Sequence, residues 1–462
     1  MSDAGTELLE QQIAAYIGHQ RWFAGKGREH EVTGLRTLAW LDGDDVRVQL
    51  ALVAVTSAAG VDTYQLPLSH RVEWAEGLEH ALVGTVDGVH VYDALHDSPA
   101  VEQITLALTT DVAVPAPLSA HRVAARDLEL GQASVLLTGE QSNSNVRVGD
   151  DLLLKLFRRV TPGRNPDIEV LEALTTCGSH EIVPLVGWLA GAEDAGELDL
   201  AMLSDYLRTA SDGWDLALTS VRDLFAERDL HPDEVGGDFA SESHRLGITA
   251  ARLHADLAAA LPHETWDHDR LSQVTARMRA RLDVAAKEVP EVAEHAPALT
   301  GAFDAMDGLT EGVAVQRVHG DFHLGQTLRT MDGWRVIDFE GEPATSLAER
   351  TALDSPMRDV AGMLRSFDYA AQSQWADLLG DHQLAQRARE WAERNRAAFV
   401  AGYAEDSGTD PAGSSAAAVL LRAYETDKAV YEAVYEARNR PTWLPIPLRA
   451  VSRLAHDTGG AS

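Results

Sequence analysis

The chain has 462 residues, of which 45% are hydrophobic and 24% are charged, the balance of a soluble globular protein. This length exceeds one ordinary hydrophobic core, so we expect two or three folding units. The formal net charge of −33 repels nucleic acid and anionic membrane surfaces, which excludes both as expected partners. Cys177 is the single cysteine, no apolar run reaches the roughly 18 residues of a membrane helix, and the N-terminus lacks a secretory signal. We therefore expect a cytoplasmic protein.

The first part of the chain predicts a small mixed α/β module. Residues 7–18 have the apolar spacing of an amphipathic helix. Trp22 and Phe23 follow and are expected to pack inward. Strand-like stretches at 46–55 and 63–68 come next, bounded by Gly-Asp and Gly-Val-Asp turns.

A second strand-rich region precedes a long stretch of helical patterns. It divides into a strand, a polar loop, a short strand and a further apolar strand, at residues 134–138, 139–145, 146–148 and 152–157. From residue 215 helical patterns dominate, interrupted by a strand-rich patch at 313–339. This order predicts an α+β fold in which a small β-rich lobe precedes a large helical lobe.

The strand-rich patch carries the residues with the clearest chemistry. His319-Gly320-Asp321 is followed five residues later by Gln326, and a hairpin with an Asp-Gly turn then ends on Asp338. A hairpin places its two ends side by side, so Asp321, Gln326 and Asp338 are expected to converge. Their carboxylate and amide oxygens are hard ligands suited to Mg²⁺, and the remaining carboxylate can orient or deprotonate a hydroxyl. The alternative is an ordinary polar turn with an acidic hairpin end.

This spacing resembles the catalytic loop and Asp-Phe-Gly segment of protein kinases, with Gln326 replacing an asparagine and Glu340 replacing a glycine. The His-Gly-Asp-x-His form is closer to aminoglycoside and choline kinases. The resemblance implies a bilobal protein-kinase-like fold.

The residues upstream of this motif follow the order expected of a kinase. The polar loop lies where ATP phosphates would bind, and Lys155 lies in the strand that follows it. A buried lysine needs a counter-charge, for which Glu169 is the candidate and Glu172 the alternative. Residues 201–207 are expected to connect the lobes beside the adenine. The candidate phosphate-binding residues of the loop are Ser142, Asn143 and Ser144.

Nearly the whole chain resembles the actinobacterial maltokinases, which make maltose 1-phosphate from maltose and ATP. The matching stretches, in order, are QRWFAGKGR (20–28), residues 139–170, HGDFHLGQTLR (319–329), VIDFEGEPATSLAER (336–350), residues 354–371 and residues 424–448. The resemblance implies an N-terminal cap fused to the kinase lobes. The expected boundaries are 1–90 for the cap, 91–205 for the N-lobe with an intermediate segment, and 206–462 for the C-lobe.

The same resemblance assigns roles to the motif residues. Asp321 would be the catalytic residue, Gln326 and Asp338 would hold Mg²⁺, and Lys155 would contact the α- and β-phosphates of ATP. His319 would brace the loop. The family's setting implies glycogen-like glucan synthesis from trehalose, with trehalose synthase as a possible partner.

The C-terminal segment predicts a sugar-binding helix face. Tyr424, Lys428, Tyr431, Tyr435 and Arg438 recur at spacings of four, three, four and three, which puts them on one face. Tyrosine rings can cover the C–H faces of a sugar, while the cations donate to its hydroxyls. The candidate substrate-binding residues are Lys428, Tyr431, Tyr435, Arg438 and Trp443. The alternative is that the tyrosines pack in the core.

Two further expectations concern helical residues near these motifs. Residues 354–371 read as a helix whose Arg358 and Asp359 pair with the catalytic hairpin or with each other. Glu432 and Glu436 lie off the tyrosine stripe and are expected to face solvent.

Two alternative functions remain open from the sequence. A related cap-bearing kinase for another sugar, such as glucosamine, is the first. A regulatory pseudokinase is the second, although the retained Lys155, Asp321, Gln326 and Asp338 argue against it.

Overall fold

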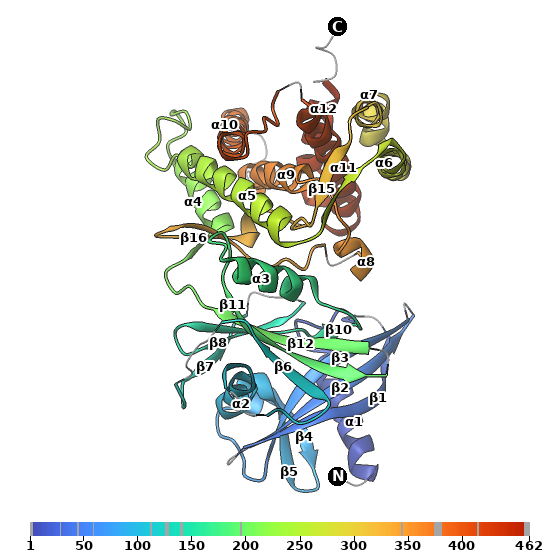
Figure 1. The fold of residues 1–462 in the computed structure, drawn as a ribbon, viewed down its shortest axis with the longest axis vertical. Coiled ribbons are helices and arrows are strands. Elements are labelled where there is room, and N and C mark those ends of the chain that lie inside the picture. The colour runs from blue at the N-terminus through green and yellow to red at the C-terminus, as the bar shows by residue number, and fades with distance from the viewer. Residues whose placement is uncertain are drawn as a thin grey trace. The chain divides into compact units, whose positions relative to one another are not determined.

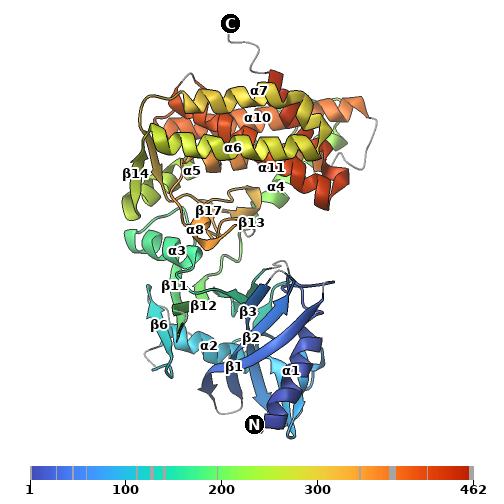
Figure 2. The same cartoon turned by 90° about the vertical axis from the view of Figure 1, so that its right-hand side faces the viewer.

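A computed structural model describes the chain apart from residues 1–2, 28, 44–45, 59, 111–112, 125–128, 139–141, 195, 343–344, 374–380, 414 and 457–462. The chain divides into two compact units, which we call the N-terminal unit (residues 1–176 and 183–208) and the C-terminal unit (177–182 and 209–462). Figures 1 and 2 show a strand-rich N-terminal unit and a mainly helical C-terminal unit. The predicted α+β class is confirmed.

The first sheet of the N-terminal unit holds the module predicted at the start of the chain. Its strands lie in the order β1-β2-β3-β5-β4, with β10 paired to β3. They are β1 (His30–Asp42), β2 (Arg47–Ser57), β3 (Gly60–Arg71), β4 (Leu82–Val86), β5 (Val89–Asp93) and β10 (Arg159–Val160). Helix α1 (Asp3–Ile17) buries Leu9, Ile13 and Ile17 against this sheet (Figure 2). The packing of Trp22 and Phe23 into the same core confirms the expectation for them.

The second sheet is antiparallel and has the order β6-β11-β12-β9-β8-β7. Its strands are β6 (Leu118–Arg122), β7 (Ser134–Leu136), β8 (Ser144–Val148), β9 (Leu152–Leu156), β11 (Leu185–Glu193) and β12 (Gly196–Asp205). Helices α2 (Ser98–Thr109) and α3 (Pro166–Cys177) belong to this region, with the short helices η1 (Glu79–Ala81) and η2 (Ala94–His96) before them. Strand β9 is central, which buries Lys155 within the sheet.

The C-terminal unit is built from long helices around a few short strands. The helices are α4 (Gly213–Ala226), α5 (Ala240–Ala260), α6 (His268–Glu288), α7 (Pro290–Asp307), α8 (Leu347–Arg350), α9 (Met357–Ser373), α10 (His382–Ser407), α11 (Ala416–Asn439) and α12 (Pro445–His456). The short elements are β13 (Ser211–Asp212), β14 (His263–Trp266), β15 (Val313–Gln316), η3 (Leu324–Gln326), β16 (Thr327–Thr330), β17 (Gly333–Val336) and η4 (Pro441–Trp443). The strand-rich patch predicted at 313–339 is confirmed by β15, β16 and β17.

Two predicted helices of this unit have identifiable ends. Helix α9 begins at Met357, whose backbone N–H donates to the Ser355 hydroxyl at 3.3 Å, so the helix predicted over residues 354–371 is confirmed with a start three residues later. Helix α11 carries the predicted tyrosine stripe and ends at Asn439, two residues before Pro441. Among the residues that the structure describes, no helix combines the length and apolarity needed to span a membrane.

Candidate active site

The predicted hairpin brings two of the three motif residues into contact. Strands β16 and β17 pair, and the Ile337 N–H donates to the Gln326 carbonyl at 3.1 Å. The Gln326 side-chain amide then donates to Asp338 Oδ2 at 3.2 Å. Asp338, two residues after β17, has a φ of +64°, a left-handed conformation that is uncommon for a non-glycine residue. A carboxylate oxygen of Glu340 lies within 4.8 Å of one of Asp338, so acidic oxygens gather at the end of the hairpin.

The segment that carries Asp321 is tied to the same hairpin through His319. The Nε2 of His319 lies 3.0 Å from the Ile337 carbonyl, which fixes its proton there. Its Nδ1 accepts from the Asp321 N–H at 3.3 Å. His319 therefore braces the loop, as expected, and Asp321 lines a cavity.

The carboxylate of Asp359 holds the catalytic loop by its backbone. Its carboxylate accepts the His319 N–H at 2.7 Å and the Gly320 N–H at 2.9 Å, and it lies 3.1 Å from His254 Nε2. Burial opposes ionisation of Asp359, but the hydrogen bonds from the His254 ring and the Gly320 N–H lower its pKa. Arg358 also donates to the Gly320 carbonyl at 3.4 Å. The expected pairing of Arg358 and Asp359 with the catalytic segment is confirmed.

A cavity of about 270 Å³ in the C-terminal unit opens beside Asp321. The catalytic loop and helices α6, α9 and α11 supply its walls. Lys428 of α11 forms an ion pair with Glu342 and lies 3.7 Å from Asp321 Oδ1. Burial opposes the charge of Lys428, but Glu342 and Asp321 raise its pKa above the ordinary value. The charged or aromatic lining residues are Trp266, Arg270, Arg277, Arg281, Asp321, Phe322, Glu342, Glu349, Asp354, Arg358, Tyr424, Asp427, Lys428 and Tyr431.

The predicted sugar-binding stripe is only partly in this cavity. Tyr424, Lys428 and Tyr431 line it, whereas Tyr435, Arg438 and Trp443 are not among its lining residues. The physical reason is the rise of a helix, about 1.5 Å per residue, which carries Arg438 roughly 15 Å along α11 from Lys428. A shared helix face therefore does not put both ends of the stripe at one small cavity.

The three residues outside the cavity have other contacts. Tyr435 stacks on Tyr431 with ring centroids 6.3 Å apart and is 43% exposed. Arg438 binds Glu288 at the end of α6, with Nε to Oε2 at 2.9 Å. Trp443 lies 6.2 Å from the Tyr369 ring. The C-terminal half of the stripe therefore lies outside the lining of this cavity, and contact of these three residues with sugar remains a prediction.

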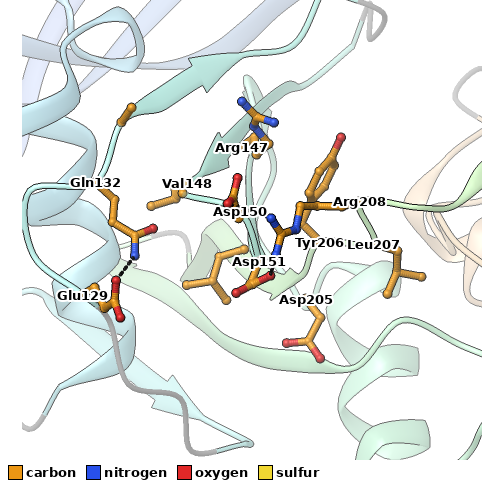
Figure 3. A pocket seen from close by; sticks show the side chains of 13 residues that line it. Glu129, Gln132, Arg147, Val148, Asp150, Asp151, Asp205, Tyr206, Leu207 and Arg208 are labelled. Carbon is orange, nitrogen blue, oxygen red and sulfur yellow. Dashed lines mark hydrogen bonds and ion pairs between the residues drawn. The ribbon is translucent and has the colours of Figure 1, made fainter.

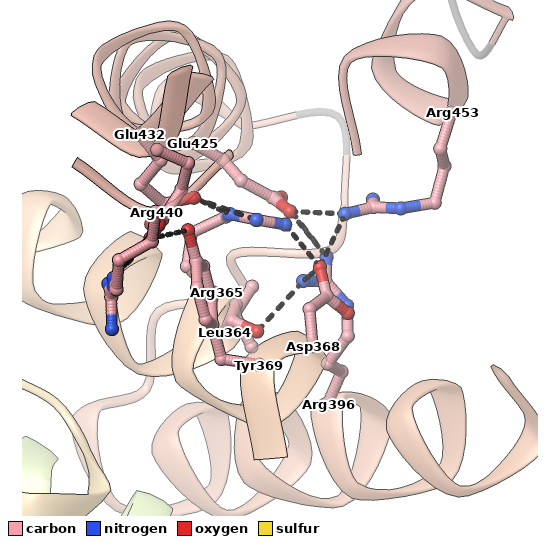
Figure 4. Close-up of polar contacts among 10 residues, drawn as sticks. Leu364, Arg365, Asp368, Tyr369, Arg396, Glu425, Glu432, Arg440 and Arg453 are labelled. Carbon is pink, nitrogen blue, oxygen red and sulfur yellow. Dashed lines mark hydrogen bonds and ion pairs between the residues drawn. The ribbon is translucent and has the colours of Figure 1, made fainter. Parts of the chain in front are cut away.

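Glu432 and Glu436 are also placed differently from the prediction. Both are buried rather than solvated. Glu432 pairs with Arg365 at 2.7 Å and Glu436 with Arg440 at 2.6 Å. Figure 4 shows Glu432 among the polar contacts that join α9 to its neighbours. The expectation was wrong because other elements cover α11 on more than one side. Residues that lie outside the tyrosine stripe are therefore also buried.

Several cavity residues were not identified from the sequence. Arg270, Arg277 and Arg281 lie on one side of α6, at spacings of seven and four residues that indicate a shared face. Asp427 pairs with Arg281 at 2.6 Å. Glu342 carries no signal of its own in the sequence, because its role depends on Lys428, 86 residues further along.

In the N-terminal unit, the buried Lys155 has an acidic partner. Its Nζ lies 2.9 Å from Asp167 Oδ2, and the two side chains are only 6% and 0% exposed. The need for a counter-charge is confirmed, but this carboxylate is Asp167, two residues before the favoured Glu169 and five before Glu172. A role of Glu169 at the ATP site remains a prediction.

Within the predicted phosphate loop, residues 139–141 lie outside the described residues. Ser142 is exposed, whereas Asn143 and Ser144 are buried. The Ser144 hydroxyl accepts from Arg158 Nε at 2.7 Å, so it is engaged inside the unit.

The predicted connection at 201–207 borders another cavity of the N-terminal unit. Strand β12 ends at Asp205, and Figure 3 shows Asp205, Tyr206, Leu207 and Arg208 at this cavity of about 830 Å³. Arg208 binds Asp150 at 2.7 Å. Contact of this segment with adenine remains a prediction.

The comparisons with known proteins agree with this geometry. The maltokinase N-terminal cap domain family matches residues 16–97, and the phosphotransferase enzyme family matches residues 135–399. Glucosamine kinase from Streptacidiphilus jiangxiensis is 30% identical over 335 residues, which is 69% of this chain and 74% of that protein. Glucosamine kinase from Mycolicibacterium smegmatis is 28% identical over 331 residues, covering 70% and 79%.

A solved structure is similar over nearly the whole chain. It is a glucosamine kinase in complex with glucosamine, ADP and inorganic phosphate. Its TM-score is 0.68 at 25% identity, with 97% of this chain and 98% of that chain covered. The chain therefore belongs to the phosphotransferase enzyme family, as a sugar kinase of the aminoglycoside-phosphotransferase type with a maltokinase-type N-terminal cap domain.

Proposed function

We propose that the protein transfers the γ-phosphoryl group of ATP to the anomeric hydroxyl of maltose, giving maltose 1-phosphate and ADP. The hydroxyl oxygen forms the new P–O bond, the bond to the β-phosphate bridging oxygen breaks, and the hydroxyl proton is released. The maltokinase-type cap and the resemblance of the motif segments support this choice of sugar. The expected place in glucan synthesis from trehalose, with trehalose synthase as partner, rests on that resemblance alone.

The observation that carries the proposal is the charge pairing of the cavity beside Asp321. Among the described lining residues, five cationic and five acidic side chains are present. Glu342 is paired with Lys428, Asp354 with Arg358 at 3.2 Å, and Asp427 with Arg281 at 2.6 Å. These carboxylates are already neutralised by the protein's own cations. Asp321 also has Lys428 at 3.7 Å, and the fifth acidic group, Glu349, is hydrogen-bonded to Ser346. Because most of the carboxylates already have a cationic partner, the cavity favours a neutral polyol over a sugar with an ammonium group.

The chain's own residues would divide the work as follows. Asp321 orients the attacking hydroxyl and takes up its proton, while the ammonium group of Lys428 offsets the negative charges of Asp321 and Glu342. The aromatic lining residues offer flat apolar surfaces to the sugar ring. Lys155, fixed by Asp167, would contact the ATP phosphates, as the resemblance implies.

A magnesium ion is expected from the fold family, and the hairpin end fits it. Asp338 offers a carboxylate. A flip of the Gln326 side-chain amide, which exchanges its nitrogen and oxygen, would place the amide oxygen where the nitrogen now meets Asp338. Hard oxygen ligands of this kind suit Mg²⁺, which takes few ligands from the protein. Gln326 and Asp338 would hold the ion, which supplies charge neutralisation for the transferred phosphoryl group.

The second candidate is phosphorylation of glucosamine, because the two relatives reported above carry the name glucosamine kinase. A panel of maltose, glucose and glucosamine with ATP and Mg²⁺, followed by ADP release, separates the two. We expect the highest kcat/KM with maltose. A preference for glucosamine would contradict the maltose assignment, and no ADP release with any sugar would favour the pseudokinase alternative.

A further inference from the structure

Helices α9, α10 and α12 line another cavity of the C-terminal unit, which we call the C-terminal cavity. Its volume is about 670 Å³, a size that accommodates a small metabolite. None of its described lining residues lines the cavity beside Asp321. The C-terminal cavity is therefore separate from the reaction centre.

Four of the described lining residues are arginines, although the whole chain has a net charge of −33. Two of them, Arg396 and Arg453, belong to a buried ionic network shown in Figure 4. They bind Glu425 at 2.9 and 2.6 Å, and they contact Asp368 at 3.4 and 3.3 Å. Burial opposes the charge of Arg453, but Glu425 and Asp368 raise its pKa. The charges of these two arginines are thus balanced within the protein.

The other two arginines, Arg389 of α10 and Arg449 of α12, have contacts with neutral amides. Arg389 Nη2 donates to Gln386 Oε1 at 2.6 Å, and Arg449 Nη1 donates to Gln372 Oε1 at 3.1 Å. Arg389 forms no ion pair with the residues that the structure describes. Burial and the neighbouring charge of Arg389 lower the pKa of Arg449. An anion bound beside both guanidinium groups would offset their mutual repulsion.

A phosphate group is the anion that matches this pair. Guanidinium groups bind phosphate and carboxylate oxygens through paired N–H donors. A phosphate ester carries a charge of about −1.5 to −2 at pH 7, so it can balance two guanidinium groups, whereas a carboxylate balances one. The Ser452 hydroxyl and the His382 ring also line the cavity and can donate to further phosphate oxygens.

We propose that the C-terminal cavity is a binding site for a phosphate group, held by Arg389 and Arg449. The ligand is either free phosphate or a small phosphorylated metabolite, because the cavity is larger than phosphate alone requires. This site is additional to those for ATP and for the sugar. The inference does not depend on which sugar the enzyme phosphorylates.

Arg394 offers a matched control on the same helix as Arg389. Its guanidinium binds Asp238 at 2.7 Å, and neither residue is among the described lining residues of the C-terminal cavity. Arg394→Met removes one positive charge from α10, as Arg389→Met does. It should leave the affinity for phosphate within twofold of wild type.

The test is calorimetric titration of the full-length protein in the presence of ADP and Mg²⁺. The probes are inorganic phosphate, glucose 1-phosphate and acetate. Arg389→Met and Arg449→Met should each weaken binding of the phosphate probes at least tenfold, the scale of one charged hydrogen bond. Tighter binding of glucose 1-phosphate than of inorganic phosphate would identify a phosphorylated metabolite as the ligand, and equal affinities would identify free phosphate. Acetate should bind more weakly than either.

The variants separate this site from the reaction centre, where the same anions can also bind. Thermal melting checks that each variant is folded, and Arg389 is exposed, so its replacement keeps the test informative if Arg449→Met folds poorly. Because the titration needs no turnover, its result stands whether or not maltose is phosphorylated.

Four outcomes overturn the proposal. The first is an affinity for both phosphate probes within twofold of wild type in Arg389→Met and Arg449→Met, which would place the anion elsewhere. The second is an equal loss in Arg394→Met, which would show a general effect of charge. The third is acetate binding as tight as phosphate binding. The fourth is no saturable binding of either phosphate probe to the wild-type chain below about 10 mM.

Discussion

Lys428 connects the helix that lines the sugar cavity to Asp321. Its ammonium group is paired with Glu342 and lies 3.7 Å from Asp321 Oδ1. A cation in this position offsets the mutual repulsion of two carboxylates that lie close to each other. The side chain therefore belongs to the reaction site as well as to sugar binding.

Replacement of Lys428 by methionine should lower kcat/KM for the sugar by about 10- to 100-fold, because one or two charge-assisted contacts are lost. Arg438→Met is the matched control, since Arg438 lies on the same helix but binds Glu288 outside the cavity. Steady-state kinetics with ATP held at saturation give the comparison. Equal losses in the two variants would contradict the placement of Lys428 at the site.

At this scale the sequence predicts local chemistry better than distant partners. Gln326 and Asp338 meet because a hairpin of fixed geometry joins them, and that hairpin is visible in the sequence. The carboxylate that pairs with Lys155 depends on which side of α3 faces the lysine. Spacing alone therefore could not decide between Asp167 and Glu169 as the partner. The contact between Lys428 and Glu342 spans 86 residues and has no local signal.

Helix α9 approaches the catalytic loop at a glycine. A Cβ atom added to Gly362 would lie 2.6 Å from the Phe322 carbonyl oxygen, a backbone atom of the residue after Asp321. The close approach explains how the carboxylate of Asp359, on the same helix, reaches the backbone N–H groups of the loop.

Gly362→Ala should displace the loop and lower kcat at least tenfold in folded protein, since small misplacement of catalytic groups is costly. Gly402→Ala is the control. There the added Cβ would lie 2.0 Å from the His244 carbonyl oxygen, between α5 and α10 and away from the loop. It should reduce stability but leave kcat per folded molecule unchanged. Unaltered kcat in Gly362→Ala would contradict the account of the loop.

Helices α9, α10, α11 and α12 share a buried ionic network, drawn in Figure 4. Glu425 of α11 binds Arg396 at 2.9 Å and Arg453 at 2.6 Å. Burial raises the pKa of Glu425, but the charges of Arg396 and Arg453 outweigh burial and lower it from 4.5 to about 2. The ionised carboxylate is thus stabilised in the folded protein relative to the unfolded chain.

A lowered pKa fixes the sign of the pH dependence. The contribution of Glu425 to stability is fully present above pH 4.5 and is lost as the pH falls from 4.5 to about 2. Glu425→Gln should therefore show a shallower loss of unfolding free energy across that range, measured by urea unfolding at several pH values. Glu432→Gln is the control, because burial raises the pKa of Glu432 and its removal should not flatten the acid limb. A wild-type slope in Glu425→Gln would contradict this account.

At the scale of the whole molecule, the cap and the second sheet form one compact unit. Strand β10 follows β9 and pairs with cap strand β3, so the two sheets are joined through consecutive residues of the chain. Gln65 and Arg158 add buried polar contacts across the same junction. The cap is therefore expected to fold with the N-terminal unit and not as an independent domain.

Hydrogen exchange under native conditions tests this cooperativity. Amides of cap strands β2 and β3 and of β9 and β12 should exchange through one opening of similar free energy, because their connections break together. Gln65→Met should lower protection in both sheets by the same amount. Cap amides that exchange at clearly lower free energy than those of β9 would contradict a single unit.

The sequence predicts the order of the regions along the chain but not that the cap and the second sheet form one unit. Strand and helix periodicities indicate a mixed α/β module, a β-rich region and a helical region in sequence order, because each periodicity depends on neighbouring residues. Arg158, just after β9, and Gln65, in β3, carry no signal of their own in the sequence. Only their contacts with Asp93 and with the Leu200 carbonyl show that they lie at a junction. The boundaries expected at residues 90 and 205 therefore remain predictions.

The most direct test of the central claim is phosphorus NMR of the purified chain with ATP, Mg²⁺ and maltose. We predict ADP and a new sugar-phosphate signal coupled to the anomeric proton. Asp321→Asn should yield neither product while still binding ADP. A new phosphate signal with glucosamine but none with maltose, or wild-type turnover by Asp321→Asn, would contradict the proposed function.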